Sequence, residues 1–188
     1  MSPTATVIVI VAIIVAVGAI VFALMQRRSA RLRQRFGPEY DRAVRETGNR
    51  YRAEAQLERL ENRMKKVDIR SLQPEERARY RDKWTAIQAR FVDDPNLALQ
   101  QADEIVRDVM GTCGYPLTGF EDQAAQLSVD HPRVVEHYRE GRAVAVKQTR
   151  HEASTEEVRR GLIHYRTLFD ELVGVPVHTR ATAGVNRA

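Results

Sequence analysis

The sequence predicts an all-α protein, with an N-terminal transmembrane helix followed by a soluble helical bundle. The first observation is the stretch VIVIVAIIVAVGAIVFALM, residues 7–25, in which every side chain is apolar or small. The second is that apolar residues of the following part recur at three- and four-residue spacing, which is typical of amphipathic helices. We expect the following segments: a short N-terminal segment 1–6, the transmembrane helix 7–25, a basic juxtamembrane segment 26–35, a helical bundle domain 36–173 and a disordered tail 174–188.

The apolar run has the length of a membrane span. Its 19 residues would form a helix about 28 Å long, close to the ~30 Å hydrocarbon core of a bilayer. A cleaved signal peptide would have a basic start and an apolar core of about 7–15 residues. The segment MSPTAT has no basic side chain and the run is longer. The sequence therefore predicts a retained, single-pass signal-anchor helix.

The segment directly after the span is strongly basic. QRRSARLRQR has no acidic residue and holds five arginines, Arg27, Arg28, Arg31, Arg33 and Arg35. The positive-inside rule places such a flank in the cytoplasm, so we expect the N-terminus outside and the C-terminal domain inside the cell. The arginines are also suited to contact anionic lipid head groups. The chain has 30 basic and 25 acidic residues, so these five account for the excess, and the balanced remainder argues against a nucleic-acid partner.

Local signals place the helices of the soluble part. Pro38 and Pro74 suit first helical positions, DDPN at 93–96 suits a turn and restart, and STEE at 154–157 forms a capping box. Gly48 marks a break between helices. The helix expected after DDPN, which carries Ala98, Ala102, Ile105 and Val109, has an apolar face wide enough to be covered on two sides. The expected inward stripes are Leu57, Leu60, Met64 and Val67; Tyr80, Trp84, Ile87 and Phe91; and Val158, Leu162, Tyr165, Phe169 and Leu172.

The stretch QLSVDHPRVVEHYREG, residues 126–141, brings together residue types found at hydrolase sites. It holds Ser128, Asp130, His131 and His137. Pro132 suits the first position of a helix over 132–150, which would make Asp130 or His131 the N-cap and give Ser128 and Asp130 capping roles. His137 would then lie too far from Ser128 for a catalytic triad. We therefore expect no catalytic residue here.

Cofactor and metal patterns are incomplete. GYPLTG at 114–119 resembles a phosphate loop, but Phe120 stands where the lysine is needed, and HEAST has Thr155 in place of the second histidine of a zinc motif. His137 and Glu140 would supply two ligands where metal sites usually have three or four. Cys113, the single cysteine, follows an expected helix C-terminus, where the dipole disfavours a thiolate. We expect no cofactor, no bound metal and no reactive thiol.

Several segments together resemble a known group of proteins. FGPEYDRAV, LSVDHPRVVEHYREG and TEEVRRGLIHYRTLFDELV resemble segments of bacterial single-span membrane proteins with a helical cytoplasmic domain. The likeness extends over residues 36–173. It implies the architecture, and the group has no assigned activity or catalytic residues to carry over.

These observations favour a non-enzymatic interaction or scaffold protein at the inner face of the membrane, acting on an unknown protein partner. Tethering would raise the effective concentration of such a module for partners at the membrane. Two alternatives stay open: a hydrolase-like enzyme with a site near Asp130 and His131, and a domain that senses anionic lipids. If the loop 111–119 packs against the helix start expected at His131, Tyr115, Asp130 and His131 would form the candidate interaction surface.

Overall fold

The computed structural model describes the backbone of residues 3–174 and the side-chain surroundings of residues 10–174. Within these ranges the protein is all-α, with eight helices and no strand. The chain forms two compact units, Met1–Leu57 and Glu58–Ala188. Residues 36–57, which the sequence analysis assigned to the bundle, therefore belong to the same unit as the long N-terminal helix. The tail 175–188 lies outside the described residues.

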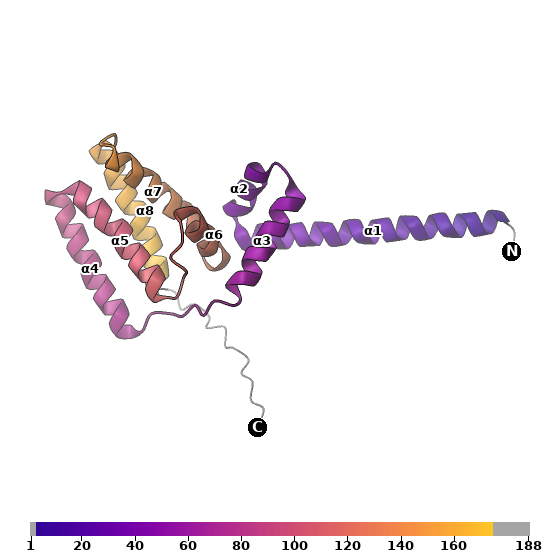
Figure 1. Ribbon diagram of the computed structural model, residues 1–188, viewed down its shortest axis with the longest axis horizontal. Helices are drawn as coiled ribbons and strands as arrows, with labels where there is room; N and C mark the ends of the chain where they lie inside the picture. Colours follow the sequence, from indigo (N-terminus) through magenta and orange to yellow (C-terminus); the bar gives the residue numbers. More distant parts are fainter. Residues whose placement is uncertain (1–2, 175–188) are drawn as a thin grey trace, which may run out of the picture. The chain divides into compact units, whose positions relative to one another are not determined.

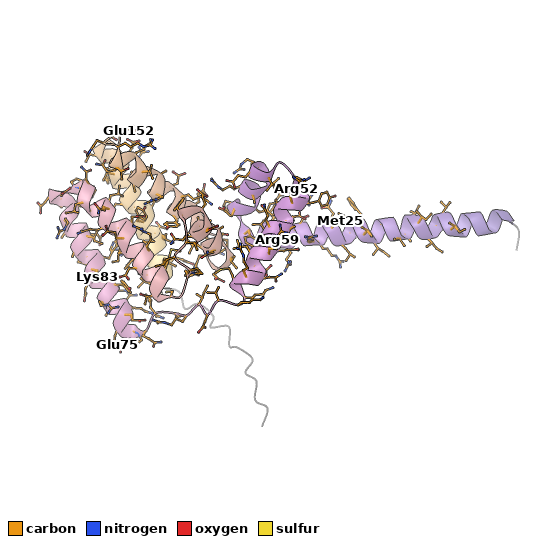
Figure 2. The ribbon with its side chains drawn as sticks, viewed as in Figure 1. Met25, Arg52, Arg59, Glu75, Lys83 and Glu152 are labelled. Carbon is orange, nitrogen blue, oxygen red and sulfur yellow. The ribbon has the colours of Figure 1, made fainter. Side chains whose placement is uncertain are left out.

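The first unit begins with a single long helix, α1 (Pro3–Phe36), drawn in Figure 1 without a break. Every residue from 10 to 28 is exposed, and Figure 2 shows side chains standing out from the helix as far as Met25. Within the described residues, the segment Ile10–Phe36 contains a stretch long and apolar enough to cross a membrane: its 18-residue apolar window has a mean hydropathy of 2.3, and none of that window is buried. The helix continues through the basic segment 26–35.

Two shorter helices follow α1. The first, α2 (Pro38–Thr47), has proline in its first turn together with the acidic residues Glu39 and Asp41. It ends at Gly48, whose φ of 61° lies in the left-handed region, as expected for a glycine cap. The next helix, α3 (Arg50–Met64), carries the buried residues Leu57, Leu60 and Met64 of the predicted stripe. Val67 lies beyond the helix end.

The described part of the second unit, residues 58–174, holds the end of α3 and a bundle of five further helices. These are α4 (Pro74–Asp93), α5 (Pro95–Thr112), α6 (Phe120–Asp130), α7 (Val135–Thr149) and α8 (Thr155–Gly174). α5 packs against α4, α7 and α8, α7 packs against α8, and α6 packs against α7 (Figure 1). The central place of α5 confirms the prediction from its wide apolar face.

Aromatic residues form much of the bundle core. The rings of Trp84 and Phe169 stack with centroids 4.7 Å apart, which joins α4 to α8. Helices α7 and α8 approach closely because α8 has a glycine at position 161. A Cβ atom added to Gly161 would lie 3.0 Å from side-chain atoms of Leu99 and Val144. Phe91, at the end of its predicted stripe, is half-buried rather than part of the core.

The local signals at the helix starts are largely confirmed. Asp94 is the N-cap of α5 and accepts a hydrogen bond from the amide of Leu97 at 3.0 Å. At the start of α8, the backbone amide of Ser154 donates to the Glu157 carboxylate at 2.9 Å, and the amide of Glu157 donates to the Ser154 hydroxyl at 3.3 Å. The predicted capping box therefore forms in both directions.

The predicted helix start at Pro132 is wrong. α6 extends to Asp130, His131 is its C-terminal cap, and α7 begins at Val135 after a turn. Ser128 lies buried in the last turn of α6, where its hydroxyl donates to the carbonyl oxygen of Ala125 at 2.6 Å. The physical reason is that a proline disfavours the helical conformation of the residue before it, which ends the preceding helix. Ser128 and Asp130 are therefore not N-capping residues.

Candidate functional site

The most unusual residue of the bundle is Asp103, a carboxylate on the buried face of α5. Its side chain is 6% exposed, and its neighbours on this face are apolar residues such as Ala102, Ile105 and Val106. Burial of a charge without partners is very unfavourable, so a buried carboxylate needs strong hydrogen-bond donors. The surroundings of Asp103 supply them from three helices.

Three side chains bind the two oxygens of Asp103. The Tyr165 hydroxyl on α8 donates to Oδ1 at 2.7 Å. The Arg142 guanidinium on α7 donates to Oδ2 at 3.0 Å, and the Arg107 guanidinium on α5 lies 2.9 Å from the same oxygen. Two positive charges therefore meet one negative charge, which leaves this cluster with a formal net charge of about +1.

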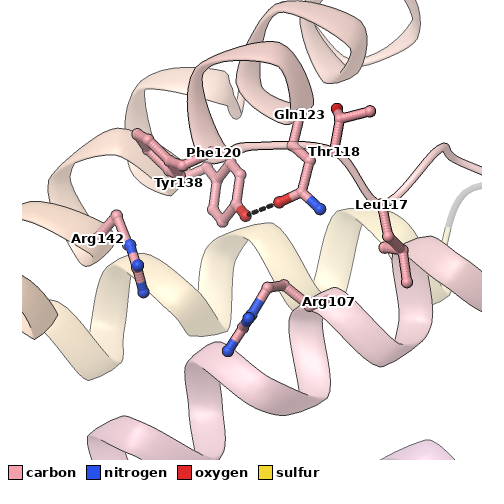
Figure 3. Close-up of a pocket in the computed structure, with 7 residues that line it drawn as sticks. All are labelled: Arg107, Leu117, Thr118, Phe120, Gln123, Tyr138 and Arg142. Carbon is pink, nitrogen blue, oxygen red and sulfur yellow. Dashed lines mark hydrogen bonds between the residues drawn. The ribbon is translucent and has the colours of Figure 1, made fainter.

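The two arginines line a cavity of about 200 Å³ beside this cluster. Figure 3 shows the guanidinium groups of Arg107 and Arg142 reaching toward it from different helices. On the opposite side, the Tyr138 hydroxyl donates to the Gln123 side-chain oxygen at 2.9 Å. We call this cavity the arginine pocket; its lining residues are Arg107, Leu117, Thr118, Phe120, Gln123, Tyr138 and Arg142.

The tyrosines of the site stay protonated across the physiological range. Burial raises the pKa of Tyr138 to about 12, with a further contribution from the negative charge of Asp103. Burial also raises the pKa of Tyr165. The negative charge of Asp103 and the hydrogen bond that its carboxylate accepts from Tyr165 raise this pKa further. Both hydroxyls therefore remain hydrogen-bond donors at neutral pH.

One side of the pocket is aromatic. The ring of Phe120, the first residue of α6, lies with its centroid 4.9 Å from that of Tyr138. The Arg142 guanidinium carbon lies 5.8 Å from the Phe120 centroid, within the range of a cation–π contact. The N-cap of α6 is Gly119. Because glycine has no side chain, no side-chain hydrogen bond caps the first amides of this helix. The pocket thus offers positive charge, hydrogen-bond donors and an apolar ring.

The residues that the sequence analysis singled out lie partly together. The Tyr115 hydroxyl donates to the Asp130 carboxylate at 3.3 Å, so the loop 111–119 does pack against the end of α6. Nδ1 of His131 lies 3.2 Å from Oε1 of Glu171 on α8. Tyr115 and His131 are nevertheless only 2% and 4% exposed. They tie the loop and α6 into the bundle and offer little area to a partner.

A histidine pair joins α7 to α8. Nδ1 of His137 lies 2.9 Å from Nδ1 of His164, so at least one of the two rings must be protonated at this nitrogen to donate the bond. Burial, followed by the nearby His137, lowers the pKa of His164. Within the described residues, no group of three or more potential metal ligands is found. The pair therefore serves as a contact between two helices.

The basic segment lies on α1, and all five of its arginines are exposed. Arg33 forms an ion pair with Asp41 at 3.1 Å, and its guanidinium carbon lies 5.2 Å from the Tyr40 ring centroid.

Cys113 is buried at the end of α5. Burial raises the pKa of this thiol to about 11, which makes it a poor nucleophile.

Sequence reasoning missed the arginine pocket, although one signal pointed to it. Asp103 interrupts an otherwise apolar stripe that contains Leu99, Val106 and Met110. A carboxylate in such a position needs buried partners. Its partners Arg142 and Tyr165 are 39 and 62 residues away in the chain, so no spacing rule could name them.

The chain matches no family model, no curated protein and no solved structure. Two features of the structure bear on function. They are the apolar helix α1, which suits a membrane, and the arginine pocket, which suits an anion.

Proposed function

We propose that this protein is a membrane-anchored helical interaction or scaffold protein at the inner face of a bacterial membrane. The observation that carries the proposal is α1, whose residues 10–28 are all exposed although most are apolar. An unburied apolar surface of this length is unfavourable in water and favourable in a lipid bilayer. The charge-free part of the helix ends at the five arginines, which we assign to the cytoplasmic side.

The anchor continues into the folded part without a flexible linker. Ser29, Leu32 and Phe36, at three- and four-residue spacing on α1, are buried. The Ser29 hydroxyl donates to Oε1 of Glu54 on α3 at 2.5 Å. The C-terminal end of α1 is therefore part of the first unit. A rigid connection of this kind supports a role in holding residues 36–57 at a fixed distance from the membrane.

Attachment is tested by alkaline carbonate extraction of membranes that contain the full chain. We expect the protein to remain with the lipid. Replacing both Ile14 and Val17 by lysine should release it, because each lysine near the helix centre opposes insertion by roughly 2.5–3.5 kcal/mol. Replacing the same two residues by leucine is the matched control. Extraction of the unaltered chain into the soluble fraction would contradict the proposal.

Orientation is tested by a reporter fused after residue 188 that is active only in the cytoplasm. We expect activity with the unaltered chain and a loss of uniform orientation when all five arginines of the basic segment are replaced by glutamine. A full-length fusion that is present in the membrane but shows no reporter activity would contradict the proposed topology. The interaction role is tested by crosslinking in intact membranes. We expect a stable crosslinked partner with the anchored chain and none with the lysine variant.

A further inference from the structure

We propose that the arginine pocket binds the phosphate group of a small phosphorylated molecule or of a lipid head group. The pocket is formed within the second unit and its binding role does not depend on the membrane anchor.

The charge of the pocket requires a negative partner. Arg107 and Arg142 share a single oxygen of Asp103, at 2.9 and 3.0 Å. Each guanidinium has five N–H donors, so one carboxylate oxygen occupies only a part of them. The two side chains are 45% and 37% exposed, so their remaining donors can reach a ligand. An anion between them would balance the positive charge that Asp103 leaves over.

The geometry favours a phosphate over a carboxylate. A carboxylate has two oxygens in one plane, whereas a phosphate group presents three oxygens at tetrahedral angles. Figure 3 shows the guanidinium groups arriving from two helices, α5 and α7. Two forks from different directions can bind three oxygens of a tetrahedral group, which is the arrangement that arginine pairs offer to phosphates.

Neutral donors complete the wall. The side-chain oxygen of Gln123 is bound by Tyr138, which leaves the amide nitrogen as the donor of this side chain. The hydroxyl oxygen of Thr118 accepts a hydrogen bond from Gln126 at 3.2 Å, so its own O–H is available to donate. Both residues line the pocket. These donors can bind phosphate oxygens that the arginines do not reach.

The size limits the ligand. A cavity of about 200 Å³ corresponds to about six or seven water molecules at ~30 Å³ each. It accommodates a phosphate and a few further atoms, and it is smaller than the ~300–1,000 Å³ pockets that enclose larger ligands. The remainder of a phosphorylated molecule would extend past Leu117, which is 63% exposed, or past Phe120.

The test uses the full chain in nanodiscs of phosphatidylcholine and inorganic phosphate as the probe. Calorimetric titration at constant ionic strength, with chloride as the replaced anion, should give a saturable isotherm with one phosphate per chain. We expect Arg107→Gln to weaken the affinity by about tenfold or more, because a hydrogen bond to a charged group contributes roughly 1.5–3 kcal/mol. Arg159→Gln is the charge-matched control, since Arg159 pairs with the exposed Glu156 on α8, and it should bind as the unaltered chain does.

A second variant separates binding from folding. Arg142→Lys keeps the positive charge beside Asp103 but removes the planar fork. We expect this variant to unfold at the temperature of the unaltered chain and to bind phosphate several-fold more weakly. No saturable heat, or equal affinities in Arg107→Gln, Arg142→Lys and Arg159→Gln, would overturn the proposal.

The two sources of the phosphate are distinguished by competition. Nanodiscs that contain phosphatidate should abolish the binding of inorganic phosphate if the natural ligand is a lipid head group. Glycerol phosphate added in solution should compete, with phosphatidate having no effect, if the ligand is a free molecule. Failure of both to compete with inorganic phosphate would overturn the assignment of the pocket to phosphorylated ligands.

Discussion

Each of the two units has a buried carboxylate that binds three side chains, and the difference between them is one arginine. In the first unit, Oε1 of Glu54 accepts hydrogen bonds from Ser29 at 2.5 Å, Tyr40 at 2.9 Å and Arg50 at 3.0 Å. In the second unit, Asp103 binds a tyrosine and two arginines. The charges of Glu54 and Arg50 cancel, whereas the Asp103 cluster keeps a formal charge of about +1.

A buried carboxylate can therefore serve two purposes, as a structural junction or as the support of a binding site. A neutral cluster has its charge balanced within the protein, and the Glu54 cluster joins α1, α2 and α3 through direct hydrogen bonds. A cluster with an excess positive charge on partly exposed arginines can attract an anion. We therefore interpret Glu54 as a structural junction between the anchor and the helices beside it, and Asp103 as the support of a binding site.

The largest effect is expected from removal of the Glu54 carboxylate. Glu54→Ala leaves the Ser29 and Tyr40 hydroxyls and the Arg50 guanidinium without their acceptor, so we expect the first unit to lose about 3 kcal/mol. Hydrogen exchange of residues 29–57 should accelerate while that of residues 95–149 is unchanged. Glu46→Ala is the control, because Glu46 is 59% exposed in its ion pair with Arg42 and such pairs contribute below about 1 kcal/mol. Equal acceleration in both regions would show that Glu54 is not a local junction.

Smaller and matched effects are expected from the two tyrosines. Tyr40→Phe and Tyr165→Phe each remove one hydroxyl and keep the ring, and each carboxylate keeps its other two donors. We expect a loss of about 1–2 kcal/mol in each variant, measured by denaturant unfolding of the full chain in nanodiscs. A loss below about 0.3 kcal/mol at either position would mean that the hydroxyl is not a partner of the carboxylate in solution.

Acid should weaken the first unit. Burial alone would raise the pKa of Glu54, but the hydrogen bonds from Ser29, Tyr40 and Arg50 outweigh it and hold the pKa below the ordinary value of 4.5. The stabilisation is thus fully present above about pH 4.5 and is lost as the pH falls through the lowered native pKa. Unfolding of the first unit at decreasing pH measures this loss, which Glu54→Gln should remove. A stability of this unit that rises below pH 4.5 would contradict the account.

The smallest change is expected at Cys113. Its pKa of about 11 against an ordinary value of 9.0 reduces the thiolate fraction about a hundredfold, and alkylation at neutral pH should be slower by at least that factor than in a denatured chain. Glu54→Ala should leave this rate unaltered, because the thiol belongs to the second unit. An accelerated alkylation of Cys113 in that variant would show that the units unfold together.

Features governed by neighbouring residues could be predicted from the sequence. Pro38, Pro74 and the Ser154–Glu157 box place helix starts because their effects act within one turn. The apolar stripes placed Trp84, Tyr165 and Phe169 in the core. The same local reasoning failed at Pro132, because a proline there both suits a helix start and ends the helix before it. In the structure the ending effect prevails, since α6 continues through the buried Leu127 and Val129 to Asp130.

The candidate site depends on distant contacts and so escaped prediction. The predicted interaction surface consists of residues that are close in sequence or lie in a neighbouring loop, namely Tyr115, Asp130 and His131. The Asp103 cluster instead requires α5, α7 and α8 to pack in one particular order. The sequence contains the exceptional residue, a carboxylate in an apolar stripe, but its partners follow only from the packing.

The difference between the two carboxylates is tested most directly by the phosphate affinity of two matched variants. Arg50→Gln and Arg107→Gln each remove one guanidinium from a buried carboxylate in the full chain, and calorimetric titration with inorganic phosphate compares them. We expect Arg107→Gln to weaken binding by about tenfold or more and Arg50→Gln to leave the affinity unaltered while it destabilises the first unit. Equal phosphate affinities in the two variants would contradict the account.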